Sequence, residues 1–262
     1  MHCNKKYRQT LIAYALISCL VTHSMTAMAN DGSAPVSGFA RAFLTGESLS
    51  DATITILETK QEIKTDKQGN FGPFHYPIGE PITLIFSKPG YVTTQSATVV
   101  VPKKGLAGSH DNITFQVPSN YVYLLLKTAI GAKENPESCH VTATILAYNK
   151  TMDDSPQGEE GATIMLTPYV NETPFYFDIF TSGPFKDKTY PFPTGLTNTS
   201  KDGGIALFNL PPRAEPYRLT AQKQGTLFSE TQFICRKGAF INISPPRGPM
   251  AEQSLFSKIN SY

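Results

Sequence analysis

The stretch ATITILETKQEIKTDKQGNF, residues 52–71, decides the fold class of this chain. Within positions 53–56, isoleucine alternates with threonine, and this period of two places apolar side chains on one face of a β-strand. Asp66 and Gly69 then supply the side-chain acceptor and the positive φ that a tight turn requires. The stretch therefore predicts a half-buried strand over 53–56 and a hairpin turn after it.

A similar pattern occurs a second time further along the chain. ATIML at 162–166 is followed by TSKDGGI at 199–205, in which Asp202 and the two glycines predict a second hairpin turn. Apolar runs at 81–86 and 217–221 follow the two turns and predict one more strand in each copy. No convincing long helical stripe occurs. We expect an all-β fold of two tandem small β-sandwich domains, of transthyretin-like or immunoglobulin-like type.

At these residues the chain resembles the carboxypeptidase regulatory-like domain family, small β-sandwiches of transthyretin-like topology. TGESLSDATI at 45–54 is similar to the family's opening T-G-x-P-L-x-G-A-x-V, with Ser48 in place of Pro and Asp51 in place of Gly. The second copy keeps GATI at 161–164 and FNLPP at 208–212, close to the family's F-x-N-L-P-P-G-x-Y-x-L-T-A. The resemblance implies the fold and no particular activity.

The N-terminus has the pattern of a secretory signal peptide. Basic residues precede an apolar stretch at 11–21, and Ala-Met-Ala at 27–29 supplies the small residues of a cleavage site. Cleavage there predicts an exported protein, periplasmic or secreted. In the alternative, the residues before Cys19 form a lipobox, and an acylated Cys19 would anchor a lipoprotein.

The predicted organisation is a signal peptide, two sandwiches joined by a linker, and a tail. The linker contains Asn-Pro, a pair typical of turns. The segments are 1–29 (signal peptide), 30–130 (first sandwich), 131–138 (linker), 139–244 (second sandwich, with an aromatic insertion at 169–196) and 245–262 (tail).

The charge of the mature chain argues against nucleic-acid binding, and the length of its apolar run at 121–130 argues against a membrane span. Loss of the signal peptide's three basic residues, from a total of 23, leaves a mature chain near balance with its 21 acidic residues. Because it has no dense Lys/Arg cluster, we expect no binding to nucleic acid. The apolar run at 121–130 is too short to span a bilayer and is predicted to be a fully buried strand. We therefore expect no membrane span in the mature chain.

Cys139 and Cys235 are the two cysteines left beyond the signal region. In an oxidising compartment they are predicted to form a disulfide, whose long loop would contribute about 3 to 5 kcal/mol. The alternative, a reactive thiol pair or a metal site with His140, lacks the C-x-x-C spacing. We expect no metal.

The chain has no recognisable catalytic constellation, and neither an enzyme nor a cofactor is predicted. It contains no His-x-x-Glu and no His-Glu-x-x-His. His75, His110 and His140 are interpreted as solvated or packed side chains. The acidic residues at 153–160 are interpreted as a solvated loop rather than a calcium site. The aspartates of the two turns are likewise interpreted as turn formers.

The second copy differs from the first by its insertion. Ile56 and Thr65 are nine positions apart, whereas Leu166 and Thr197, taken as their counterparts, are thirty-one apart. Rings offer a large contact area at low entropic cost, so the aromatic insertion is a candidate binding patch. The alternative is an extra hairpin that covers a sheet face. The candidate ligand-binding residues are Tyr169, Phe175, Tyr176, Phe177 and Tyr190.

The sequence is consistent with three classes of function. The leading one is an exported, non-catalytic binding or adhesion module with a protein partner. The second is carbohydrate binding of the starch-binding-like type, although the chain has no Trp for sugar stacking. The third, an enzyme of unrecognised type, has no residue in its favour. A pilin-like Lys–Asn isopeptide is disfavoured, because the opening strands at 36–44 and 140–148 contain no Lys.

Overall fold

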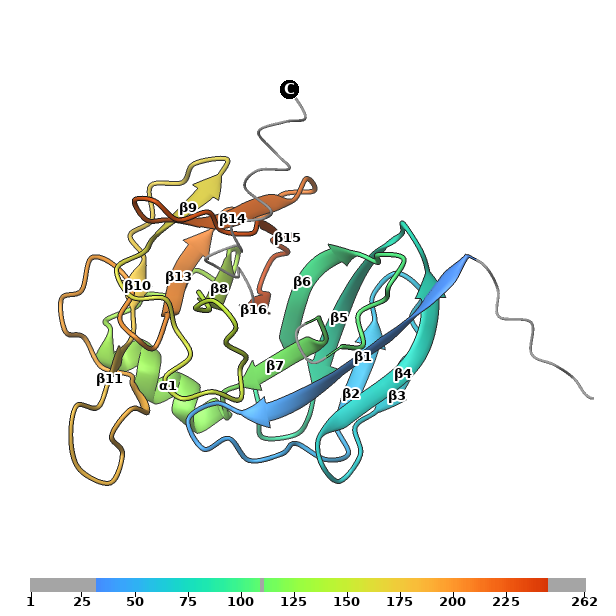
Figure 1. Cartoon of the computed structure of the whole chain (residues 1–262), viewed down its shortest axis with the longest axis horizontal. Helices are drawn as coiled ribbons and strands as arrows, with labels where there is room; N and C mark the ends of the chain where they lie inside the picture. The colour runs from blue at the N-terminus through green and yellow to red at the C-terminus, as the bar shows by residue number, and fades with distance from the viewer. Residues whose placement is uncertain (1–31, 109–110, 245–262) are drawn as a thin grey trace, which may run out of the picture. The chain divides into compact units, whose positions relative to one another are not determined.

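A computed structural model of the chain describes residues 32–108 and 111–244 (Figure 1). The predicted signal peptide, the lipobox alternative at Cys19, His110 and the tail at 245–262 lie outside the described residues. Sixteen strands and one α-helix make up the regular structure of the described part. The all-β class predicted from the sequence is confirmed.

The first sandwich consists of two facing layers of strands. One layer is a sheet in the order β4-β1-β7, and the other is the part β6-β5-β2-β3 of an eight-stranded sheet. The strands are β1 (Ser33–Ala42), β2 (Thr53–Ile56), β3 (Glu62–Lys64), β4 (Asn70–Pro77), β5 (Pro81–Ser87), β6 (Thr94–Val100) and β7 (Ile113–Val117).

Alternating burial builds the core of the first sandwich. Along β1 and β2 every second side chain is buried, so the isoleucines of β2 lie in the core and its threonines are half-buried. The ring of Phe115 lies 6.2 Å from that of Phe71 in its own sheet and 5.9 Å from that of Phe86 in the facing one. The half-buried strand predicted at 53–56 is confirmed.

The second sandwich has the same two-layer plan. The rest of the eight-stranded sheet, β10-β13-β8-β16, faces a sheet in the order β15-β14-β9 across one apolar cluster. A separate two-stranded sheet, β11-β12, lies within the insertion. The strands are β8 (Cys139–Thr144), β9 (Thr163–Thr167), β10 (Phe175–Tyr176), β11 (Asp178–Ile179), β12 (Thr189–Tyr190), β13 (Gly204–Leu210), β14 (Tyr217–Gln222), β15 (Thr231–Phe233) and β16 (Phe240–Ile243).

The same pair of hydrogen bonds at a threonine hydroxyl recurs in both sandwiches. The Thr65 hydroxyl accepts from the Ala52 N–H at 2.9 Å and donates to a backbone carbonyl at 2.6 Å. The Thr199 hydroxyl accepts from the Ala162 N–H at 2.9 Å and also donates to a backbone carbonyl. Thr199 is therefore the counterpart of Thr65, and the correspondence predicted with Thr197 is wrong by two residues.

The turns after these threonines are tight, but they are not hairpins. Gly69 and Gly203 both have positive φ, 78° and 75°, as the sequence predicted for a turn glycine. However, β3 and β4 belong to different sheets, and β12 pairs with β11 rather than with β13. Each turn carries the chain from one sheet to another. The hairpin interpretation is wrong because the pairing partners come from elsewhere in the sequence.

The run predicted as a buried strand is the helix α1 (Asn120–Ala129). The Ser119 side chain caps its first turn by accepting from the Val122 N–H at 3.2 Å. Gly131, with φ 67°, follows the C-cap and allows the chain to leave the helix. No residue of α1 is fully buried. The strand prediction is therefore wrong in both structure and burial.

The two sandwiches share a sheet. The last strand, β16, pairs in parallel with β8 on one side and with β6 of the first sandwich on the other. Residues 131–138, the predicted linker, connect α1 to β8. The domain boundary at this linker stays a prediction.

Candidate functional site

The insertion divides its predicted binding residues between core and surface. Tyr176 is 5% exposed, and its hydroxyl accepts a backbone hydrogen bond from β9 at 3.3 Å. Phe177 is also buried, whereas Phe175 and Tyr190 are half-buried. Tyr169 is 82% exposed. Of these five residues, only Tyr169 therefore lies open to solvent.

The part of the insertion around β11 and β12 carries a cluster of rings. Phe180 lies 5.7 Å from Phe185 and 5.0 Å from Tyr190, and Tyr190 lies 5.5 Å from Phe192, between ring centroids. Phe185 and Phe192 are exposed. The aromatic composition predicted such a cluster, but not which rings face solvent.

Helix α1 presents large apolar side chains to solvent, which the sequence analysis missed. Tyr121, Leu124 and Leu125 are 69%, 53% and 47% exposed. The opposite side of the helix, with Leu126 and Ile130, lines a cleft. Helical spacing puts the three exposed residues on one face.

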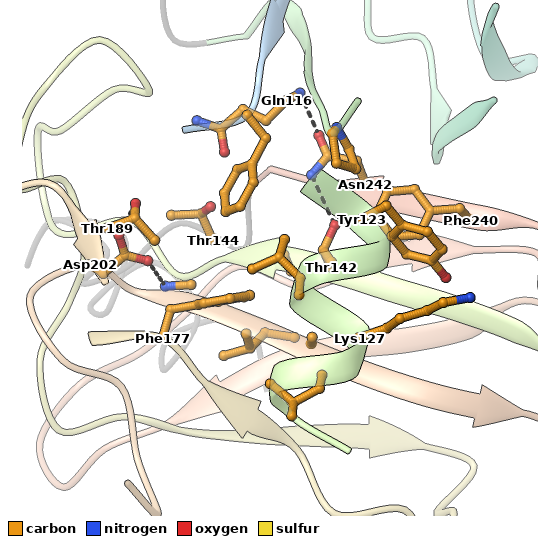
Figure 2. Close-up of a pocket in the computed structure, with 18 of the residues that line it drawn as sticks. Gln116, Tyr123, Lys127, Thr142, Thr144, Phe177, Thr189, Asp202, Phe240 and Asn242 are labelled. Carbon is orange, nitrogen blue, oxygen red and sulfur yellow. Dashed lines mark hydrogen bonds between the residues drawn. The ribbon is translucent and has the colours of Figure 1, made fainter. Parts of the chain in front are cut away.

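A cleft separates α1 from the insertion (Figure 2). Its floor is the sheet surface of β8, β13 and β16, and its walls are α1 on one side and Phe43, Phe177 and Thr189 on the other. The cavity measures about 50 Å³. This space is far below the several hundred cubic ångströms of typical drug-sized ligand sites, so only a small or slender group fits.

Asp202 is a buried carboxylate in the wall of this cleft. It is 4% exposed and accepts hydrogen bonds from the Thr189 hydroxyl at 2.6 Å and the Gly204 N–H at 2.9 Å (Figure 2). Burial raises the pKa of the Asp202 carboxyl to about 6, and the Asp178 carboxylate also raises it, against these hydrogen bonds. The carboxyl group is thus poised to change charge near neutral pH.

The second turn does not use Asp202 as the first turn uses Asp66. In the first turn, the Asp66 carboxylate accepts from the Gln68 N–H at 2.9 Å. In the second, the Ser200 hydroxyl fills this place and accepts from the Asp202 N–H at 3.0 Å. Asp202 therefore occupies the position of Gln68, and the turn-former interpretation is incomplete for it.

Two residues that line the cleft, Tyr123 and Lys127, belong to a polar cluster around Glu134. Tyr123 donates to Glu134, Lys127 donates to it at 2.6 Å, and His140 lies 3.9 Å away. Burial opposes ionisation of Glu134, but the bonds from Lys127 and Tyr123 hold its pKa below the ordinary value. Burial lowers the pKa of His140, which favours the neutral imidazole. The hydrogen bonds of the cluster tie α1 to the segment 131–138.

The FNLPP motif has a structural role in this cluster's neighbourhood. Asn209 adopts φ 60° at an irregularity of β13, a conformation in which Asn is enriched. Its amide donates to the Lys133 carbonyl at 2.9 Å and accepts from the Asn135 N–H at 2.7 Å. Its backbone N–H donates to His140 Nδ1 at 3.2 Å. The motif therefore pins residues 131–138 to the sheet.

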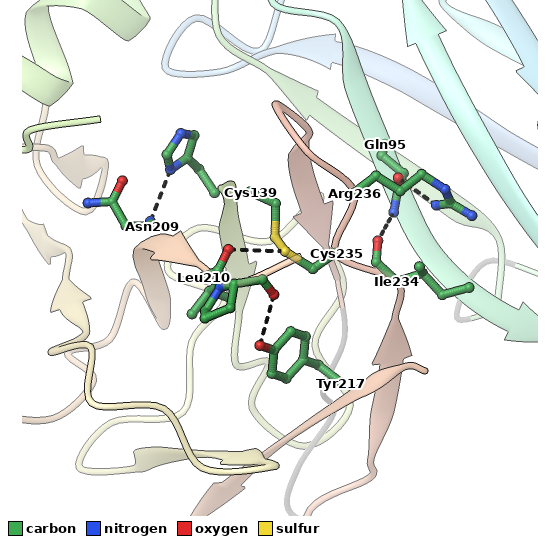
Figure 3. Close-up of a disulfide and its surroundings, with 10 residues drawn as sticks. Gln95, Cys139, Asn209, Leu210, Tyr217, Ile234, Cys235 and Arg236 are labelled. Carbon is green, nitrogen blue, oxygen red and sulfur yellow. Dashed lines mark hydrogen bonds between the residues drawn. A yellow bond between two sulfur atoms is a disulfide. The ribbon is translucent and has the colours of Figure 1, made fainter. Parts of the chain in front are cut away.

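The predicted disulfide between Cys139 and Cys235 is present, with Cα atoms 5.6 Å apart (Figure 3). It joins the start of β8 to the segment that follows β15. Next to it, Gln95 of β6 donates to the Ile234 carbonyl at 2.9 Å and accepts from Arg236 at 2.8 Å. The bridge thus lies beside a buried contact with the first sandwich.

The remaining predicted side chains do not converge on a site. Asp153 pairs with Arg41, and Asp154 accepts from the Thr151 N–H at 2.7 Å. His75 is exposed. Across 32–108 and 111–244, no three His, Cys, Asp or Glu residues are grouped as a metal site would require. The same residues contain no helix of the length and apolarity needed to cross a membrane.

Comparison with known proteins gives no family. No family model matches the sequence, and no curated protein matches it. Several solved structures match at low similarity. The Bacillus anthracis TIE protein is 16% identical at a TM-score of 0.26, over 84% of this chain and 35% of that one. This chain therefore spans about a third of that protein.

Two pilins are further examples. The shaft pilin SpaA from Lactobacillus rhamnosus GG is 11% identical at a TM-score of 0.26, over 83% of this chain and 99% of that one. The Streptococcal ancillary pilin is 9% identical at a TM-score of 0.24, over 81% and 69%.

Proposed function

We propose that this chain is an exported, non-catalytic binding or adhesion module that holds a protein partner on exposed apolar side chains. The observation that carries the proposal is the outer face of α1, where Tyr121, Leu124 and Leu125 are all exposed. A helix that is apolar all round is normally buried. Exposed apolar patches of this kind are typical of interaction sites.

The insertion adds to this surface. Thr189 of the insertion and Leu126 of α1 line opposite walls of one cleft, so the two elements are neighbours. The exposed rings of Phe185 and Phe192 lie on the insertion, as does Tyr169. Aromatic anchors contribute strongly to protein interfaces because they bury a large area with few rotatable bonds. We assign the partner contacts to α1 and these rings together.

Two further lines support the proposal. The Cys139–Cys235 disulfide fits an oxidising compartment, in agreement with the predicted export signal. The resemblance to carboxypeptidase regulatory-like domains remains a prediction, and its accessory, non-catalytic character agrees with a binding role. Carbohydrate binding is the second candidate because Tyr169 offers an open ring for stacking.

The test uses the mature protein as bait in extracellular and envelope fractions, followed by affinity measurement with the purified partner. We expect Leu124→Ala with Leu125→Ala to weaken binding by more than about fivefold, roughly 1 kcal/mol, if these residues are anchors. Val100→Ala, which changes an exposed apolar residue of the first sandwich, is the matched control. If the unmodified protein, the double variant and Val100→Ala all bind the partner with equal affinity, the assignment is overturned. If a glycan binds and Tyr169→Ala loses affinity for it, the second candidate is favoured.

A further inference from the structure

The Asp202 carboxylate is buried without a cationic partner. It is 4% exposed, and none of the ion pairs within the described residues includes it. Its charged neighbour is Asp178, another carboxylate. A buried charge is costly unless it is paired, so this arrangement leaves a place for a positive group.

The turn accounts for one hydrogen bond of this carboxylate but not for its burial or its place in the cleft. In the first sandwich the corresponding position holds Gln68, which is exposed, and the Asp66 carboxylate accepts from both the Gln68 and the Asn70 N–H groups. In the second turn Ser200 and Asp202 divide these two bonds between them. Hydrogen bonds from Thr189 and Gly204 occupy two of the roughly four acceptor sites of the Asp202 carboxylate. Acceptor capacity therefore remains on a group that lines the cleft.

The surroundings specify the kind of cation. The rings of Phe43 and Phe177, 6.0 Å apart between centroids, line the cleft together with Asp202. Aromatic faces attract ammonium groups, whereas an inorganic cation such as Ca²⁺ requires six or more oxygen ligands. Leu126 and Ile130 supply an apolar wall for a short alkyl chain.

The lysine that lines the cleft does not supply the cation next to Asp202. Lys127 lines the same cleft, but its Nζ donates to Glu134 at 2.6 Å, and Figure 2 shows its side chain extending away from Asp202. The small volume of the cavity, about 50 Å³, admits a slender group and excludes a bulky one.

We propose that this cleft binds a protonated primary amine on a short alkyl chain, either a free amine or the end of a lysine side chain, with its ammonium group paired with Asp202. The proposal goes beyond the binding function above. It involves the inner side of α1 rather than the exposed face, so either can fail without the other.

The pKa of Asp202 gives the proposal a pH signature. At pH 7 a carboxyl group with a pKa of about 6 is mostly ionised, and an ammonium ligand favours that form. Binding should weaken as the pH falls through about 6. Asp178 is the charged neighbour of Asp202. Lys127 of the cleft lining is paired with Glu134, and burial lowers the pKa of His140, which lies beside Glu134.

The experiment titrates the mature protein with n-butylammonium chloride at pH 7 and follows backbone amide NMR signals, with n-butanol and KCl as neutral and inorganic controls. We expect saturable shifts at Thr189 and Gly204, with binding at least about tenfold tighter than for n-butanol. Capped lysine, Nα-acetyl-lysine-methylamide, is the second probe. If it binds as tightly as n-butylammonium, the site accepts a lysine side chain, and if only n-butylammonium binds, the site is for free amines.

Two variants locate the site. Asp202→Asn should lower the affinity for n-butylammonium at least about tenfold. Asp66→Asn, the same change in the exposed turn of the first sandwich, should leave it unchanged. Equal binding of n-butanol and n-butylammonium by the unmodified protein would overturn the proposal, even if Asp202→Asn fails to fold. Unchanged affinity in a folded Asp202→Asn protein would overturn it as well.

Discussion

At the scale of single residues, hydrogen bonds identify the corresponding positions of the two sandwiches more clearly than residue types do. The Thr65 and Thr199 hydroxyls make the same pair of bonds in the two sandwiches. Counting from these threonines places Asp66 opposite Ser200, and both cap the turn that follows. Asp202 lies two positions further along the turn than Asp66 does, and it takes over only the bond from the residue after the turn glycine.

The buried carboxyl of Asp202 predicts a pH dependence of stability. Its folded pKa of about 6 lies above the ordinary 3.8, so the folded state holds the proton more tightly. The proton on Asp202 therefore stabilises the folded state fully below pH 3.8. This stabilisation is lost as the pH rises through about 6, so the free energy of unfolding falls by about 3 kcal/mol. Relative to the unmodified protein, Asp202→Asn should therefore gain stability from pH 4 to pH 7, as measured by urea unfolding.

Asp66→Asn is the control for this measurement. Asp66 is exposed, and hydrogen bonds lower the pKa of its carboxyl group. The bond from the Asn70 backbone has the largest effect. The stabilisation of the fold by ionised Asp66 is present above the pKa of this group in the unfolded chain, and it is lost only in more acidic solution. The difference between Asp66→Asn and the unmodified protein should thus stay nearly constant from pH 5 to pH 7. A constant difference for Asp202→Asn as well would show that its pKa is not raised.

At the scale of elements, strands with a clean period were predictable and the helix was not. β2 alternates Ile with Thr, and its structure follows the pattern. The run that forms α1 is apolar on both faces, so the 3.6-residue period that would mark a helix is hidden. Ser119 before the run and Gly131 after it were the available signals, as an N-cap and a C-terminal glycine.

The insertion was identified from its composition, but burial decides what each ring does. Tyr176 lies in the core and Tyr169 in solvent. Tyr176→Ala removes a buried ring and should lower the free energy of unfolding by about 3 to 5 kcal/mol. Tyr169→Ala, the matched exposed control, should change it by less than about 0.5 kcal/mol. Urea denaturation of both variants checks this, and similar losses for the two would contradict the burial described.

At the scale of the whole molecule, the disulfide fastens the second sandwich. Its two cysteines are 96 positions apart, and a bridge that closes so long a loop contributes about 3 to 5 kcal/mol. Replacing both Cys139 and Cys235 by Ser should lower the melting temperature in calorimetry. Amide exchange should rise in β8 and β16 while the core strands β2 and β5 stay protected. Uniform loss of protection would mean that the two sandwiches unfold as one unit.

Neither cysteine spacing nor strand pattern could predict how the halves join. Strand pairing between β16 and β6 depends on contacts across most of the chain, and local periodicity carries no information about them. Gln95 illustrates the point, because a buried glutamine in β6 is explained only by the Ile234 carbonyl and Arg236 that it meets in space.

The place of β16 also sets an order of events during biosynthesis. Its residues are among the last of the described chain to be made, yet they fill the position between β6 and β8. Until they arrive, β6 has an open edge whose free N–H and C=O groups can recruit a strand from another nascent molecule. Completion of the C-terminal half is thus the step that covers this edge of β6, at Thr94 and Gln95.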